Sequence, residues 1–467
     1  MRILVECPQG RTAEREYIIR VLLKDFLGLD YDFLQCDSKW VRIHAEGRSF
    51  LLADDFFSVA GSEWLAPSSL PKQPLKLWDV SQFLLPSQCV DMRIPIIYGS
   101  DPAYDFATVG DESIRIGLDI FGSAFFMLSR YEEAVKSKRD GRDRFPATAS
   151  LAYQEKFLDR PIVNEYLEIL WAALSRLWPG LARKPRTYSV TLSHDVDTPF
   201  EHAFAGPLRL LRSCASDVIN RKQFLGPVHR FPQWLRVRKG DRSADPCNNF
   251  DAIMDLSEQH HLRSAFYFIA DHSAGSVDGL YDLGHPWIRD LIRRISRRGH
   301  EIGLHASYNT YTDPDQTLRE FEILRRICVE EGVEQQRWGG RQHILRWETP
   351  TTFQNWNDAG LDYDSTLTFA DVAGFRCGVC YDYRAFNVRT STALRLIERP
   401  LIAMECTVMD KRYMGLGDRD RALAEIVRLQ ERCKLFEGNF TLLWHNSRLV
   451  NPQELLLYNR VLSAICP

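Results

Sequence analysis

The sequence has 467 residues, of which 45% are hydrophobic and 26% charged, as in an ordinary globular protein with a sizeable core. Its formal net charge of −3 excludes the overall basic character that is typical of nucleic-acid-binding proteins, so no nucleic-acid partner is expected. No run of about 18 apolar residues occurs, and the sequence therefore predicts no transmembrane helix.

The apolar run of the amino-terminal segment is too short for a signal peptide, and the eleven cysteines are scattered along the chain. Scattered cysteines suit reduced thiols. Both features predict a cytoplasmic protein, and peripheral membrane association is left open.

The first part of the chain mixes strand and helix patterns. Residues 2–7 (RILVEC), 42–53 (RIHAEGRSFLLA) and 93–99 (RIPIIYG) are predicted strands, and residues 119–133 and 164–178 are predicted helices. A further helix is predicted where apolar residues recur at three- and four-residue steps: Ile18, Ile19, Leu22, Leu23 and Phe26. Pro179 and Gly180 end the last helix, and the segment PGLARKPRT is the best linker. A domain boundary is placed near residue 185.

Beyond this linker, strands and helices alternate. Strands are predicted at residues 188–194, 264–270, 301–305, 394–404 and 440–445, and helices at 250–260, 286–298, 315–331, 350–359 and 420–435. Such alternation predicts parallel β/α units in a barrel or an open sheet. The active site of these folds lies at the carboxyl ends of the strands.

Several of these strands end in groups that carry chemistry. In TYSVTLSHDVDTPF the side chains of Asp195 and Asp197 share one face, and His194 points to the other, where it is expected to pack in the core. Two further strands end in His305 and His445. Acidic and imidazole groups at one edge of a sheet favour a metal-assisted hydrolytic site.

These motifs resemble those of the polysaccharide deacetylases of the NodB-homology type, carbohydrate esterase family four, whose fold is a distorted (β/α) barrel. SHDVDT is similar to the family's first motif, which implies that Asp195 is the base and Asp197 a metal ligand. HASYN matches the histidine-pair motif at His305, with Asn309 in place of the second histidine. The resemblance further implies that Arg341, in GGRQHILRW, orients the base, and that His445, in LLWH, is the general acid.

Other positions are open at this stage. His343 is an alternative to Asn309 as the third ligand, because an amide oxygen binds zinc less well than imidazole does. Asp364, in LDYDSTL, loosely matches an aspartate that tunes the acid. Trp347 and Trp444 are candidate sugar-binding platforms, with packing in the core as the alternative.

The resemblance extends to the first part of the chain, which looks like the amino-terminal region of one bacterial branch of these deacetylases. It implies an α/β accessory domain over residues 1–185 and a barrel over residues 186–467. The implied activity is removal of an acetyl or formyl group from an amino sugar in surface-polysaccharide biosynthesis, on a glycan or on a lipid- or nucleotide-linked sugar. The implied cofactor is a divalent ion, first of all zinc, with manganese, cobalt, nickel or magnesium as alternatives.

Two other functions are compatible with the sequence. The replacement of a histidine by Asn309 suggests a carbohydrate-binding protein on the same fold that has lost catalysis. A hydrolase that acts on a non-sugar amide would carry the same motifs.

Overall fold

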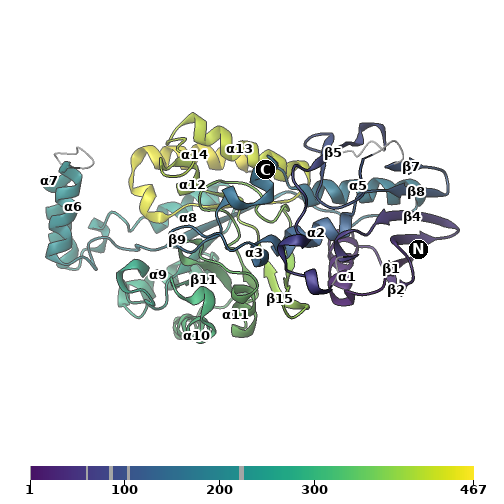
Figure 1. Cartoon of the computed structure of the whole chain (residues 1–467). Coiled ribbons are helices and arrows are strands. Elements are labelled where there is room, and N and C mark those ends of the chain that lie inside the picture. Colours follow the sequence, from purple (N-terminus) through teal and green to yellow (C-terminus); the bar gives the residue numbers. More distant parts are fainter. Residues whose placement is uncertain (1, 59–60, 84–87, 103–105, 220–225, 467) are drawn as a thin grey trace. The chain divides into compact units, whose positions relative to one another are not determined.

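The structure, a computed structural model, describes residues 2–58, 61–83, 88–102, 106–219 and 226–466 (Figure 1). The chain forms two compact units, neither of which is contiguous in sequence. Unit 1 takes residues 1–189, 347–402 and 428–440, and unit 2 takes residues 190–346, 403–427 and 441–467. A division of the chain into two domains near residue 185 stays a prediction.

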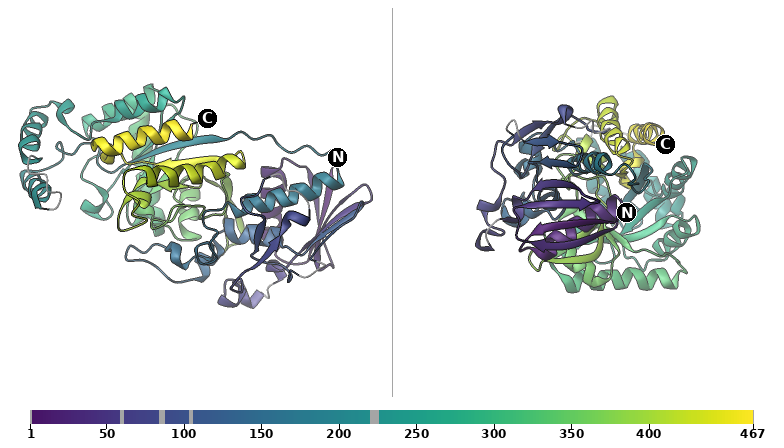
Figure 2. Two further views of the ribbon diagram at one scale, coloured as in Figure 1. Left: turned by 90° about the horizontal axis from the view of Figure 1, so that it is seen from above. Right: turned by 90° about the vertical axis from the view of Figure 1, so that its right-hand side faces the viewer.

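Unit 1 contains a mixed sheet, which is seen in Figure 2. Its strand order is β2-β1-β3-β4-β8-β7. Its strands are β1 Ile3–Pro8, β2 Tyr31–Cys36, β3 Trp40–Ala45, β4 Arg48–Ala53, β7 Ala107–Val109 and β8 Ser113–Ile116. A separate antiparallel pair is formed by β5 Lys76–Asp79 and β6 Arg93–Ile96. Three more strands, β13 Tyr363–Asp364, β14 Tyr383–Asn387 and β15 Thr392–Glu398, pair in the order β14-β15-β13.

The helices of unit 1 are α1 Thr12–Ile19, which continues as the π-helix Arg20–Phe26, then α2 Ile120–Leu128, α3 Tyr131–Val135, α4 Leu151–Gln154, α5 Ile162–Leu177 and α11 Thr351–Ala359. Two predicted elements are each divided in two. The predicted strand 42–53 turns at Glu46 and Gly47, whose φ angles of 51° and 78° suit a tight hairpin. The predicted helix 119–133 breaks at Arg130, whose φ is 54°.

Unit 2 is built around strands in the order β12-β11-β10-β9-β17-β16. Their bounds are β9 Ser189–Val196, β10 Ser264–Phe268, β11 Glu301–Ala306, β12 Gly339–Gln342, β16 Ala403–Met404 and β17 Asn439–Leu443. β9 to β12 are mutually parallel, and β16 is parallel to β17. Every residue of β10 is buried, as expected for a parallel sheet that is covered on both faces.

The helices of unit 2 are α6 Pro207–Ile219, α7 Gly226–Arg238, α8 Phe250–Gln259, α9 Pro286–Arg297, α10 Pro314–Glu330, α12 Glu405–Met409 and α14 Pro452–Ile465, and α13 Asp420–Leu435 is shared with unit 1. The predicted alternation of strands and helices is confirmed. One element is wrong: residues 394–404 are not a single strand, since β15 ends at Glu398 and β16 begins at Ala403. Pro400 lies in the gap, and proline has no N–H to donate to a neighbouring strand.

The fold class is mixed α/β, and closure of the strands into a barrel stays a prediction. None of the helices in the described ranges has both the length and the apolar character needed to cross a bilayer.

The pairing of β11 with β12 leaves no room for a side chain at Gly340, so Gly340→Ala is expected to destabilise unit 2. The added Cβ would lie 1.8 Å from the carbonyl oxygen of Leu304. Such overpacking costs about 1–3 kcal/mol or more, which should lower the midpoint of chemical denaturation. Gly206→Ala is the matched control, because its Cβ would meet nothing within 4 Å. Equal midpoints for the two variants would contradict the described strand pairing.

Candidate metal centre

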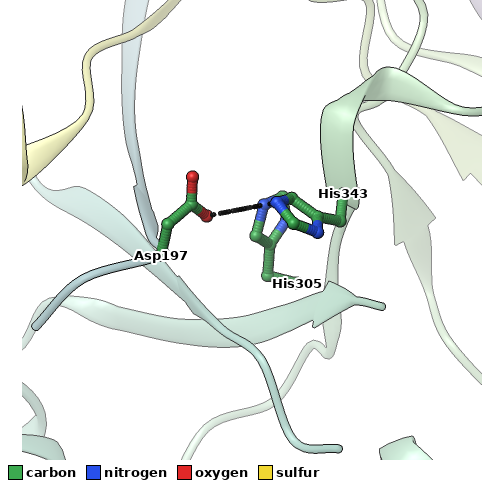
Figure 3. Close-up of side chains that lie close together, drawn as sticks. All are labelled: Asp197, His305 and His343. Atoms are coloured by element: carbon green, nitrogen blue, oxygen red, sulfur yellow. Dashed lines mark ion pairs between the residues drawn. The ribbon is translucent and has the colours of Figure 1, made fainter. Parts of the chain in front are cut away.

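Three side chains from three separate segments of unit 2 converge on one point (Figure 3). Asp197 follows β9, His305 lies near the end of β11, and His343 follows β12. The Nε2 atom of His305 lies 3.2 Å from Oδ1 of Asp197, and Nε2 of His343 lies 3.9 Å from the same oxygen. One ligand atom from each residue lies within 4.8 Å of the others, which is close enough for all three to bind one ion.

The two imidazole rings are oriented by hydrogen bonds at their other nitrogen. Nδ1 of His305 lies 3.0 Å from the carbonyl oxygen of Arg341, and Nδ1 of His343 lies 2.8 Å from Oδ1 of Asp278. Both partners are acceptors, so each Nδ1 carries a proton and each Nε2 is the nitrogen that faces Asp197. Metal-binding histidines almost always have such a partner.

Asp197 fits the role of a metal ligand. Its Oδ1 atom is buried and accepts no hydrogen bond from the described residues, although it faces His305. Buried carboxylate oxygens normally have a hydrogen-bond or metal partner. One carboxylate and two imidazoles form a donor set that suits zinc and leaves coordination positions open. The residues present therefore fit a divalent ion.

Asp195 is the second carboxylate at the end of β9, and it is paired differently. It is buried, and its Oδ1 accepts a hydrogen bond of 2.7 Å from Nη1 of Arg341, while Nη2 of Arg341 donates to Oγ of Ser193. Burial alone would raise the pKa of Asp195, but the charges of Arg341, His305 and His445 together outweigh it and lower this pKa below its usual range. Asp195 is thus held ionised, 3.6 Å from Nε2 of His305.

His445 follows β17 and completes the ring of charged groups around Asp197. Its Nε2 atom lies 3.7 Å from Oδ2 of Asp197, and its Nδ1 atom lies 2.6 Å from Oε1 of Glu405. Burial alone would lower the pKa of His445, but Glu405 and Cys406 together, through their charges and hydrogen bonds, raise it well above its usual value. The imidazole is therefore protonated at neutral pH.

Glu405 is a site residue that the sequence analysis missed. It is the first residue of α12 and comes directly after β16, so its position at a strand end was the available signal. Asp364 had been considered for this role, and that assignment stays a prediction that its hydrogen bonds to Thr366 do not favour. The carboxylate of Asp364 accepts hydrogen bonds from the backbone N–H and the hydroxyl of Thr366, whereas Glu405 is the acid that contacts His445.

Asn309 is exposed, and its amide is engaged by other groups. Its Nδ2 donates to the carbonyl oxygen of Ser273 at 3.0 Å, and its Oδ1 accepts from Arg346 at 3.2 Å. His343 instead places a nitrogen beside Asp197. Binding of the ion by Asn309 stays a prediction that the hydrogen bonds do not favour.

The two tryptophans singled out in the sequence are both buried. Trp444 is 0% and Trp347 is 1% exposed, so neither presents a ring face to solvent. Trp444 packs edge-on against Tyr458, and Trp347 packs edge-on against Phe353. Their prediction as sugar-binding platforms is wrong, and the alternative of core packing is confirmed. His194 is likewise buried, as predicted, and stacks on Phe266.

The backbone after His343 is strained. Ile344 and Leu345 both have a φ of 59°, a left-handed conformation that is unusual for residues with side chains and rare for a β-branched one. Such residues cost about 1–3 kcal/mol each and occur mostly where function requires them. The strain accompanies the turn that brings His343 toward Asp197.

Comparisons with known proteins cover different parts of the chain. The model of a family of unknown function, DUF7033, matches residues 3–179. No curated protein matches the sequence.

Among solved structures, a putative polysaccharide deacetylase from Mycobacterium smegmatis is similar, with 17% identity and a TM-score of 0.38, over 61% of this chain and 85% of that one. PuuE allantoinase has 13% identity and a TM-score of 0.36 over 61% and 85% of the two chains. A probable polysaccharide deacetylase from Pseudomonas aeruginosa PAO1 has 14% identity and a TM-score of 0.34 over 61% and 86%. The sequence identities and TM-scores are both low, so these likenesses assign no activity to this chain.

Replacement of the two candidate third ligands tests the arrangement. We expect His343→Ala to weaken Zn²⁺ binding by at least about tenfold, because it removes a nitrogen that faces Asp197. Asn309→Ala should leave the affinity unchanged, since its amide is engaged with Ser273 and Arg346. Competition with a chromogenic chelator measures both. Loss of the ion in Asn309→Ala, with retention in His343→Ala, would reverse the assignment.

Proposed function

We propose that the protein is a metal-dependent hydrolase that removes an N-acyl group, acetyl or formyl, from an amino sugar. The observation that carries the proposal is the placement of an ionised carboxylate, Asp195, and a protonated imidazole, His445, around a three-residue metal site. A site that only binds an ion has no use for a separate base and acid on its flanks.

Asp197, His305 and His343 would hold the ion. When bound, a divalent ion in such a site supplies a Lewis acid that polarises the amide carbonyl and lowers the pKa of water. Zinc is the first candidate, and manganese, cobalt, nickel and magnesium are the alternatives.

The base and the acid follow from the two ion pairs of the site. Asp195 stays ionised beside Arg341 and accepts the proton of the water that attacks the acyl carbon. The carbon–nitrogen bond then breaks, and protonated His445 donates its Nε2 proton to the departing amine. Glu405 fixes the His445 ring and keeps it charged. The products are a carboxylic acid and a free amino sugar.

We propose the substrate at the level of its chemical class. An amino sugar in surface-polysaccharide biosynthesis, carried on a lipid or a nucleotide, is our first choice, together with a cytoplasmic location. A non-sugar amide would require the same groups, and a panel of N-acyl sugars and cyclic amides separates the two classes.

A carbohydrate-binding protein without catalysis is the second candidate, and Asp195→Asn decides between the two. Loss of the base should lower the rate of amine release by about 10²–10⁴-fold, because general base catalysis contributes about that much. Zn²⁺ content, measured in the same preparation, should be kept. Asp315→Asn, at an exposed position of α10, is the matched control and should be fully active. Bound glycan without turnover in the unaltered protein, at full metal loading, would favour the binding protein.

Glu405→Gln tests the role of the second ion pair through pH. The carboxylate of Glu405 raises the pKa of His445, so its removal should lower this pKa. A general acid is active in its protonated form, and the alkaline limb of the kcat profile should therefore move to lower pH. Rates of amine release at a series of pH values measure the shift. An unmoved alkaline limb would show that His445 is not the group that limits the rate at high pH.

A further inference from the structure

Helices α6 and α7 form a pair that stands apart from the other helices of unit 2 (Figure 1). They contact each other, and the base of the pair is attached to the segment that follows β9. Nε1 of Trp234 donates to the carbonyl oxygen of Ala205 at 3.1 Å, and Arg230 forms an ion pair with Glu201. The pair is therefore attached to the segment that comes a few residues after Asp197.

Both helices expose large apolar side chains to solvent. On α6, Leu208 is 74% and Leu211 is 65% exposed, and on α7, Phe231 is 54% and Leu235 is 39% exposed. Residues three or four apart lie on the same face of a helix, so each helix carries its own apolar face. Among the described residues no other large apolar side chain is as exposed as Leu208. Clustered apolar side chains of this kind mark interaction surfaces.

The same segment is strongly basic. Residues 207–242 contain nine Lys or Arg, two Asp and no Glu, in a chain whose formal net charge is −3. Arg212, Arg238 and Lys239 are exposed. Exposed leucine and phenylalanine combined with Arg and Lys are typical of helices that lie in the surface of an anionic membrane. Phosphate contacts to a nucleic acid would use the basic residues but would leave the leucines without a role.

A cavity of about 670 Å³ lies between the α7 end of this segment and residues next in sequence to the candidate metal centre. It is lined by Arg230 of α7, by Thr198, which follows Asp197, and by Ser447, two residues after His445. The cavity thus brings α7 close to the segments that follow Asp197 and His445.

We propose that the α6–α7 pair docks on an anionic membrane surface, with Leu208, Leu211, Phe231 and Leu235 inserted among the lipids and the basic side chains at the headgroups. Docking itself stands on the helix pair alone. Together with the proposed hydrolase activity, on which this second statement rests, it selects a lipid-linked amino sugar as the substrate.

Flotation of the full-length protein with vesicles tests the docking. Binding to phosphatidylglycerol-containing vesicles should be strong at low salt and should fall at high salt, because the attraction is electrostatic in part. Pure phosphatidylcholine vesicles should bind at least about tenfold less protein. Leu208→Ser, Leu211→Ser and Phe231→Ser combined should reduce binding to the anionic vesicles by at least about tenfold, since apolar insertion supplies the remaining attraction.

Two further variants keep the test decisive. The double variant Arg212→Glu with Lys239→Glu changes no apolar side chain. It should also reduce flotation by at least about tenfold, because it weakens the attraction to anionic headgroups. Leu318→Ser with Val329→Ser removes two exposed apolar side chains of α10 and should bind as the unaltered protein does. Equal flotation of all variants, or retention of an oligonucleotide without any flotation, would overturn the proposal. Amine release from a soluble N-acyl amino sugar, assayed in parallel, reports separately on the hydrolase.

Discussion

Negative charge at the end of β9 is the constraint on which the rest of unit 2 depends. Asp195, in β9, and Asp197, directly after it, both lie close to Nε2 of His305, and two such carboxylates repel each other unless cations compensate them. Asp195 is compensated by Arg341, whose Nη1 donates to its Oδ1 at 2.7 Å. Arg341 lies in β12, which is separated from β9 by β11 and β10. Asp197 faces three imidazoles, from His305, His343 and His445. Their arrangement leaves room for an ion between two of these rings and the carboxylate.

Each of these groups is held in turn by a second partner. Asp278 fixes His343 while it also accepts hydrogen bonds from the backbone N–H groups of Ala274 and Tyr308, and Glu405 fixes His445. A catalytic group whose ring or carboxylate is already oriented loses little freedom when the substrate binds. The parallel strands supply this order, because their carboxyl ends bring residues distant in sequence to one edge of the sheet.

The segment between β9 and α8 adds a feature that the chemistry alone does not require. Its helices α6 and α7 place exposed leucines and basic side chains on the connection that follows Asp197, and Arg230 of α7 lines the cavity beside it. The proposed lipid-docking surface and the proposed hydrolytic site would thereby share one connection of the fold. In this arrangement, binding to a membrane would determine which substrates come close to the candidate metal centre.

Much of unit 2 follows from local sequence patterns. Alternation of apolar residues and helical spacing are properties of short segments, so they determined the alternating strands and helices and placed Asp195, Asp197, His305 and His445 at strand ends. Pairings between distant segments were decided only by the tertiary structure. His343 and Asp278 are 65 residues apart and His445 and Glu405 are 40 apart, and no local pattern specifies such contacts. The burial of Trp347 and Trp444 was also decided there, because the exposure of a side chain depends on what packs over it.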